Sequence, residues 1–286
     1  MKYPGRLLAA IAAVSFFALS VVIPTNAWAG SSTPVLDRIQ KSGKLVIGTS
    51  ANMPLMSEQL ETGEIAGFDI DMATALAESM GVKLEVKVIP FDKLIPALES
   101  GKVDAVFSNM TMTVERNMHV AFAGPYFVSG KCLITKEEEM AKKSDAKELK
   151  AEDLSIAVVK GSTSELFVRE LLPQLKRIAV SDVDKGTNMV EKGKAKAMMT
   201  DFPICLSVMK RYPDKGFQSV VSLLTYEPIG IALPANDPLF VNLAENFIQR
   251  ADGVGLTEEL ALKWFGDAIL SIIEQEQKKE AGKNGK

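Results

Sequence analysis

Signals for strands and helices alternate along most of this chain, and this alternation constrains the fold more than any other feature. In the predicted helix at 68–80 apolar residues recur every four positions until Gly81, whereas apolar and charged residues alternate over 82–88 as in a strand. The first round of elements comprises a strand at 45–48, a helix at 68–80, a strand at 82–88, a helix at 92–101 that Asp92 can cap, and a strand at 103–107. Elements in this order build a mostly parallel sheet flanked by helices.

A second round of elements follows a polar segment at 136–153 that is rich in Lys and Glu. It is predicted to contain strands at 154–159, 195–199 and 229–233, and helices at 164–172, 203–211, 238–250 and 256–276. Pro203 lies in the first turn of one of these helices, and Asp237 can cap another. The sequence therefore predicts an α/β protein with two sheets.

The first 29 residues have the pattern of a secretory signal peptide. Lys2 and Arg6 precede an apolar run at 7–23, and an A-x-A site ends at Ala29. The alternative is a membrane anchor, but the run is near the short limit for a spanning helix and a cleavage site follows it. We expect cleavage after Ala29 and, since no cysteine follows that site, a periplasmic protein without a lipid anchor. The polar tail at 277–286 is expected to fray.

Composition limits what the rest of the chain can do. Cleavage would leave about 255 residues, more than one compact core usually holds, which favours two lobes. Lys and Arg number 33 against 36 Asp and Glu, so we expect no basic face for nucleic acid. His119 is the only histidine, which disfavours a histidine metal site or a catalytic triad, and we expect no metal or cofactor. Cys132 and Cys205 could form a disulfide in an oxidising compartment, but the sequence does not establish that they are close.

Polar residues follow three of the predicted strands, at the edge where open α/β sheets bind small ligands. After the strand at 103–107, Asn109 and Thr111 are spaced so that their side chains face the same way in extended backbone. Arg116 then offers a planar fork that suits a carboxylate. The alternative for Arg116 is a surface arginine beside a turn.

The other two loops carry hydroxyls and an acid. After the strand at 154–159, Ser162 and Thr163 open a helix whose N–H groups can receive an anion, or else the hydroxyls only cap that helix. Asp201 follows the strand at 195–199, where it could meet a ligand ammonium or again only cap a helix. An arginine and hydroxyls can bind a carboxylate, and an aspartate can bind an amine. Together they would match the two charged groups of an α-amino acid.

These residues resemble the periplasmic amino-acid-binding proteins that serve ABC importers, the histidine and lysine/arginine/ornithine binders among them. The resemblance extends from about Leu36 to Gly266, and it depends on the order and spacing of short motifs. The motifs are Gly43-Lys44-Leu45-Val46-Ile47-Gly48, Gly67-Phe68-Asp69-Ile70-Asp71, Leu94-Ile95-Pro96-Ala97-Leu98, Gly101-Lys102-Val103-Asp104, Thr113-Val114-Glu115-Arg116 and Gly124-Pro125-Tyr126.

The resemblance implies a two-lobed Venus flytrap fold in which the chain crosses twice between the lobes, near 128–130 and 226–228. Lobe 1 would comprise 30–128 with 228–276, and lobe 2 would comprise 129–227. A ligand that contacts both lobes favours the closed state, which the membrane permease of an ABC importer would then recognise. The resemblance also implies a monomer without catalytic residues.

The resemblance further implies roles for single residues at matching motif positions. Arg116 resembles the clamp on the ligand carboxylate, with Thr111 as a hydroxyl contact and Asn109 as a second contact. Thr163, with Ser162, matches the carboxylate loop of the second lobe.

Three more positions complete the implied site. Asp201 matches the acid that binds the ligand ammonium, and Phe91 matches a wall against the ligand side chain. Asn52 begins a segment where relatives often carry an aromatic residue, so an aromatic sandwich is not expected here. Such a pocket would suit a small polar or modest apolar side chain, and the choice between these stays open.

Two other functions fit the same fold. Cyclohexadienyl (arogenate/prephenate) dehydratases resemble this chain at 36–39 and 194–201, but they carry a carboxylic acid three residues after the matching aspartate. That position here is Ile204, which cannot transfer a proton. A free-standing sensor that presents its ligand to a signalling receptor is the other alternative.

Overall fold

The computed structural model describes residues 33–141, 154–220 and 225–267. The predicted signal peptide, the polar tail, most of the polar segment at 136–153 and the end of the last predicted helix lie outside these ranges. Within them, no helix is both long and apolar enough to cross a membrane.

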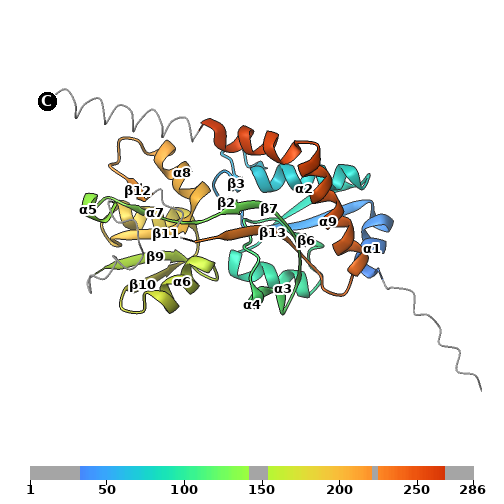
Figure 1. Ribbon diagram of the computed structural model, residues 1–286, viewed down its shortest axis with the longest axis horizontal. Coiled ribbons are helices and arrows are strands. Elements are labelled where there is room, and N and C mark those ends of the chain that lie inside the picture. The colour runs from blue at the N-terminus through green and yellow to red at the C-terminus, as the bar shows by residue number, and fades with distance from the viewer. Residues whose placement is uncertain (1–32, 142–153, 221–224, 268–286) are drawn as a thin grey trace, which may run out of the picture. The chain divides into compact units, whose positions relative to one another are not determined.

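The first sheet has five strands in the order β5-β1-β6-β13-β7 (Figure 1). These strands are β1 (Lys44–Thr49), β5 (Lys83–Val88), β6 (Ala105–Val106), β7 (Ala121–Ser129) and β13 (Glu227–Leu233). Strand β1 pairs in parallel with β5 and β6, whereas β13 pairs antiparallel with β6 and β7. The fold class is confirmed: β5, β1, β6 and β7 run in the same direction, and only β13, which returns from late in the chain, runs antiparallel to its neighbours.

The second sheet repeats this plan in the order β10-β9-β11-β8-β12. Its strands are β8 (Lys131–Thr135), β9 (Ser155–Val159), β10 (Lys176–Val180), β11 (Ala197–Asp201) and β12 (Gln218–Val220). Strands β10, β9 and β11 are parallel, and β8 runs antiparallel to β11 and β12. We call the first sheet with its helices lobe 1 and the second sheet with its helices lobe 2.

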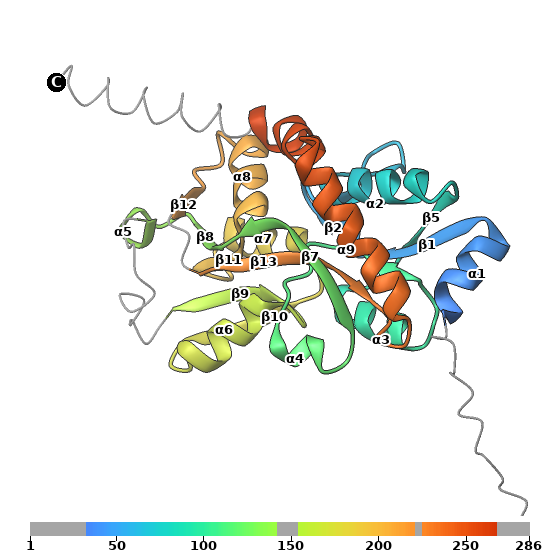
Figure 2. The same ribbon diagram turned by 45° about the vertical axis from the view of Figure 1, so that its right-hand side comes forward.

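Helices cover both faces of each sheet, as Figure 2 shows. Lobe 1 carries α1 (Pro34–Ser42), α2 (Phe68–Ser79), the 3₁₀ helix η1 (Phe91–Lys93), α3 (Leu94–Glu99), α4 (Val114–Asn117) and α9 (Pro238–Gly253), with further helix at 256–267. Lobe 2 carries α5 (Glu138–Ala141), α6 (Thr163–Leu171), α7 (Val183–Glu191) and α8 (Phe202–Arg211). Helices α2 and α9 lie on one face of the first sheet and α3 on the other; α6 and α8 lie on opposite faces of the second sheet (Figures 1 and 2).

The chain passes between the two sheets at two neighbouring places. Strand β7 of the first sheet leads through Gly130 into β8 of the second, and β13 of the first sheet follows β12 of the second. The first residue of β13, Glu227, pairs with Ser129, the last residue of β7. Residues at these two connections therefore lie next to each other, between the lobes.

Some elements differ from the sequence-based expectation. Helix α7 was not predicted. Strand β10 was also missed, because it is largely exposed and buries only its last residue. The short strands β2 (Asn52–Met53), β3 (Ser57–Gln59) and β4 (Ile65–Ala66) form a small separate sheet that was also missed. The prediction that Asp92 caps a helix is wrong, because Asp92 lies inside η1 and its carboxylate pairs with Lys160 of lobe 2 at 3.0 Å.

The cysteines, whose pairing the sequence left open, form a disulfide. Cys132 in β8 bonds to Cys205 in α8, so the bridge ties a helix to the central part of the second sheet. Both residues are buried.

Asp237 caps helix α9, as predicted, and it has a second role. Its Oδ1 accepts the N–H of Phe240 at 3.0 Å. Its Oδ2 accepts the N–H groups of Val35 and Leu36, each at 2.9 Å, at the start of α1. One fully buried carboxylate therefore joins α1 to α9, two helices of lobe 1 that lie far apart in sequence.

Candidate functional site

The loop after β6 places Arg116 at the interface between the lobes. Thr113 caps α4 by accepting the N–H of Arg116 at 3.1 Å. The guanidinium carbon lies 5.6 Å from the centre of the Phe91 ring, and Nη1 donates to the carbonyl oxygen of Thr111 at 2.8 Å. Burial lowers the pKa of Arg116 to about 10, against the opposing effect of Asp201 and other acids, so the group stays protonated at neutral pH.

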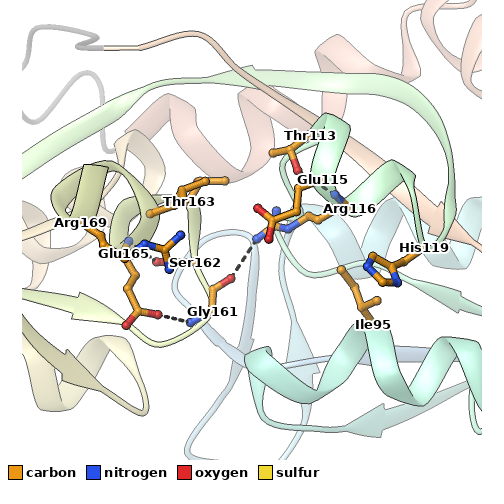
Figure 3. A pocket seen from close by; sticks show the side chains of 11 residues that line it. Ile95, Thr113, Glu115, Arg116, His119, Gly161, Ser162, Thr163, Glu165 and Arg169 are labelled. Carbon is orange, nitrogen blue, oxygen red and sulfur yellow. Dashed lines mark hydrogen bonds between the residues drawn. The ribbon is translucent and has the colours of Figure 1, made fainter. Parts of the chain in front are cut away.

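Arg116 and Thr111 of lobe 1 meet the loop before α6 of lobe 2. Nη2 of Arg116 donates to the carbonyl oxygen of Gly161 at 3.1 Å, a contact that Figure 3 shows. The hydroxyls of Thr111 and Thr163 lie 3.4 Å apart. The first two strand-following loops of the sequence prediction thus face each other across the cleft.

Ser162 is the N-cap of α6. Its hydroxyl accepts the N–H of Glu165 at 3.2 Å, and the Glu165 carboxylate accepts the N–H of Gly161 at 2.8 Å. Ser162 therefore acts as a helix cap, the alternative in which its hydroxyl accepts a backbone N–H of its own helix. Thr163 instead turns its hydroxyl to the interior, where it contacts Lys131 at 2.6 Å and Glu227 at 3.1 Å.

Asp201 ends β11 rather than following it, and it does not cap α8 with its side chain. Its Oδ2 accepts the side-chain N–H of Asn109 from lobe 1 at 2.7 Å. Its Oδ1 accepts Nζ of Lys131 at 2.5 Å. The alternative of a mere helix cap is therefore wrong for Asp201, which lies in the cleft with a cation already beside it.

Sequence reasoning missed Lys131 and Glu227. The side chain of Lys131 is fully buried, and its Nζ lies 3.3 Å from Oε2 of Glu227. Burial alone would raise the pKa of Glu227, but the charge of Lys131 and hydrogen bonds from threonine hydroxyls lower it. Both residues adjoin the predicted crossings, and Lys131 is a lone lysine in an apolar strand, which is the signal that could have found it.

The backbone of Asn109 is held in place by another buried acid. Its φ of 48° is left-handed, so the expectation of extended backbone at this residue is wrong, although its side chain does face the cleft. Asp69, at the start of α2, accepts the N–H of Asn109 and the Tyr126 hydroxyl, each at 2.7 Å. Burial raises the pKa of Asp69 to about 7, more than these hydrogen bonds lower it.

Two amide oxygens in this region are buried without a hydrogen-bond partner. They are Oδ1 of Asn109 and Oδ1 of Asn52, the latter in the short strand β2. Buried acceptors are normally paired, so these two oxygens, which have no partner among the described residues, are acceptors open to a donor.

A pocket of about 230 Å³ opens between the lobes at the outer side of Arg116 (Figure 3). It is lined by Ile95, Thr113, Glu115, Arg116 and His119 of lobe 1 and by Gly161, Ser162, Thr163, Glu165, Leu166 and Arg169 of lobe 2. Three of the predicted site residues, Arg116, Ser162 and Thr163, line this pocket. The other five, Asn52, Phe91, Asn109, Thr111 and Asp201, do not.

Within the described ranges, no group of three or more His, Cys, Asp and Glu side chains is arranged to hold a metal ion. His119 lies at the pocket rim, where its Nδ1 is 3.2 Å from Oε1 of Glu99. The arrangement of arginine, hydroxyls, amide and acid therefore points to binding through hydrogen bonds and ion pairs.

Comparison with known proteins agrees with this geometry. Residues 45–267 match the family model of the bacterial extracellular solute-binding proteins, family 3. The chain belongs to this family. Among solved structures, an ancestral amino acid-binding protein, AncCDT-1, described as a precursor of cyclohexadienyl dehydratase, superposes with a TM-score of 0.74 at 36% identity, covering 80% of this chain and 99% of its own. A mutant of the arginine-binding protein of T. maritima gives a TM-score of 0.76 at 28% identity, covering 81% and 99%.

Curated relatives include binding proteins and one enzyme. The glutamine-binding protein of Geobacillus stearothermophilus is 31% identical over 211 residues, which is 72% of this chain and 78% of the relative. The cyclohexadienyl dehydratase of Pseudomonas aeruginosa is 28% identical over 233 residues, 80% and 85% of the two chains. The family assignment made from sequence motifs is confirmed.

Proposed function

We propose that this protein captures an amino acid or a close analogue by closing its two lobes, and delivers it to an ABC importer. The observation that carries the proposal is the set of contacts across the cleft: Arg116 to Gly161, Thr111 to Thr163, and Asn109 to Asp201. A ligand that joins these groups stabilises the closed form, because only that form makes both halves of the contacts.

The roles proposed for the site follow from its charges. Arg116 binds the ligand carboxylate, since its fork is held in place by backbone carbonyls of both lobes and the group stays charged. The ligand's amino group lies at the other end, near Asp201 and Asn109. Phe91 packs against Arg116 and supports its guanidinium from one side.

The proposed setting is the periplasm, with the membrane permease of the importer as partner and the monomer as the working form. The family assignment and the export signal expected at the N-terminus support this setting. Co-purification of the mature chain with the candidate permease, in the presence and absence of the best ligand, tests the partner.

Thermal-shift measurement on refolded, ligand-stripped protein with a panel of amino acids and carboxylates tests the binding function, because a ligand that binds only the folded state raises the unfolding midpoint. Arg116→Ala is expected to weaken the best hit by about 2–4 kcal/mol, as loss of one partner of a buried charged pair usually does. Arg116→Lys, which keeps the charge but loses the fork, is the matched control and is expected to lose part of this energy. An unchanged midpoint shift in Arg116→Ala would contradict the clamp.

We also propose that the protein is not a dehydratase, although the ancestral and curated relatives make that reaction the second candidate. Ile204 stands three residues after Asp201 and is an alkyl side chain with no exposure. Glu227 is a carboxyl in the cleft, but its lowered pKa leaves it ionised at neutral pH and so without a proton to donate. Incubation with arogenate and prephenate should give no phenylalanine or phenylpyruvate, and their formation would overturn this proposal.

A further inference from the structure

Lys131 supplies a cation to Asp201 from within the protein. Its ammonium has three donors, and three acceptors surround it: Thr163 Oγ1 at 2.6 Å, Asp201 Oδ1 at 2.5 Å and Glu227 Oε2 at 3.3 Å. Lys131, Thr163 and Asp201 all belong to lobe 2, so this pairing does not depend on closure. The acid proposed for the ligand's amino group therefore has a cation beside it before the ligand arrives, although Glu227 shares this cation.

Glu227 does not need a ligand cation either. Its Oε1 accepts the Thr225 hydroxyl at 2.8 Å, and its Oε2 accepts the Thr163 hydroxyl at 3.1 Å besides facing Lys131. The two carboxylates thus share Lys131, and each has further donors, the Asn109 amide for Asp201 and the Thr225 and Thr163 hydroxyls for Glu227. Arg116 remains as the cation for the ligand carboxylate.

Asn109 offers the ligand an uncharged acceptor, which can bind a neutral donor as well as a charged one. The side chain is buried, with the residue 2% exposed, and its Nδ2 is bound to Asp201 Oδ2. That bond fixes the amide orientation, because the nitrogen has to face the carboxylate. The oxygen, Oδ1, then points elsewhere and has no partner. An amide oxygen accepts a hydrogen bond from a hydroxyl as well as from an ammonium.

We propose that this cleft takes 2-hydroxy carboxylates as well as 2-amino carboxylates, because Lys131 already pairs with Asp201 and Asn109 Oδ1 accepts the donor at the ligand's second carbon. The inference rests on the proposed function, in which Arg116 holds the ligand carboxylate. It narrows that function to ligands defined by a carboxylate with a hydrogen-bond donor on the neighbouring carbon.

Calorimetric titration of refolded, ligand-stripped protein tests the inference. The probes are 2-amino acids with aliphatic, amide and basic side chains, together with the 2-hydroxy acid and the 2-oxo acid of each side chain. For the side chain that binds best, the Kd of the hydroxy acid is expected within about tenfold of that of the amino acid. The oxo acid, which has no donor at this carbon, is expected to bind at least about tenfold more weakly than the hydroxy acid.

The outcomes separate the two proposals. A gap larger than about tenfold between amino and hydroxy acid, or binding by amino acids alone, would overturn this inference and leave the proposed function intact. Binding by none of the three series would overturn the carboxylate clamp itself, and this inference with it.

A double variant tests the part played by Lys131. Lys131→Met with Glu227→Gln removes one cation and one anion, which leaves Asp201 without its internal partner at unchanged net charge. The gap between hydroxy and amino acid is expected to widen at least about tenfold, because the ligand ammonium then meets an unpaired acid. An unchanged gap in the folded variant would contradict the role of Lys131.

A matched control uses the exposed pair Lys44–Glu85, 3.0 Å apart on the first sheet. Lys44→Met with Glu85→Gln removes the same charges far from the cleft and is expected to leave every Kd unchanged. Circular dichroism and the unfolding midpoint report whether each variant folds. If the Lys131 double variant does not fold, Lys131→Gln keeps donors for Thr163 and Asp201 while removing the charge, and it is expected to widen the gap in the same direction.

Discussion

The buried acid beneath the binding loop predicts a specific dependence of stability on pH. Asp69 contacts the backbone of Asn109 and the hydroxyl of Tyr126, and burial raises its pKa from 3.8 to about 7. Asp69→Asn keeps the shape and both hydrogen bonds, because the amide oxygen can accept from the Asn109 N–H while the amide nitrogen donates to the Tyr126 oxygen. The substitution removes only the titration.

The sign of the effect follows from which state binds the proton. Between about pH 4 and about pH 7 the folded protein keeps Asp69 protonated while the unfolded chain releases the proton, so the free energy of unfolding falls as pH rises through this window. A shift of about three pKa units at about 1.4 kcal/mol each gives a loss of ~4 kcal/mol by about pH 8. The asparagine side chain does not titrate, so the variant does not lose this part of its free energy of unfolding. It should therefore gain ~4 kcal/mol on the wild type between about pH 4 and about pH 8.

Urea unfolding of both proteins, followed by circular dichroism at several pH values, measures this difference. Subtracting the wild-type curve from that of the variant removes the titration of the other acids, among them Asp92, Asp182 and Glu227, whose pKa values are lowered and whose contributions have the opposite slope. Parallel curves for the two proteins from about pH 4 to about pH 8 would refute the reasoning, because they would mean that Asp69 titrates equally in both states.

Three further predictions concern the scaffold. Reducing Cys132–Cys205, whose sequence separation is 73, should lower the free energy of unfolding by about 4 kcal/mol, measured by urea unfolding with and without reductant. Gly161→Ala should weaken ligand binding by about 1–2 kcal/mol in calorimetry, because φ is +77° and the new Cβ would lie 3.0 Å from Asp92 across the cleft; an unchanged Kd would contradict this. Asp237→Ala should cost about 2–4 kcal/mol in urea unfolding, because three amides of two helices lose their acceptor, and a cost under about 1 kcal/mol would show that they find another.

The periodicity of apolar residues predicted the elements that carry most of the core. Strands β1 and β9 and helices α2 and α8 begin and end within one residue of their predicted bounds, and α9 begins where predicted but ends three residues later. These elements bury a continuous stripe or run, so the signal is local and readable. Elements with little buried surface, such as β10, left no such signal.

The sequence pointed to the three candidate binding loops because each follows a buried strand and carries polar side chains. The sequence could not choose between a helix cap and a ligand contact for Ser162, Thr163 and Asp201, because the same side chain at a helix start satisfies both. The structure separates them: Ser162 caps its helix, whereas Thr163 and Asp201 face the interior.

The sequence by itself determined the α/β class, the family, and the three loops from which the cleft is built, because periodicity and motif spacing are local properties of the chain. Only the tertiary structure decided that Lys131 pairs with Asp201, that Cys132 bonds to Cys205, and that Asn109 keeps an oxygen without a partner among the described residues. These facts depend on groups tens of residues apart that meet in a buried space. The energy of a buried charge is set by the groups that surround it in the fold, not by its neighbours in sequence.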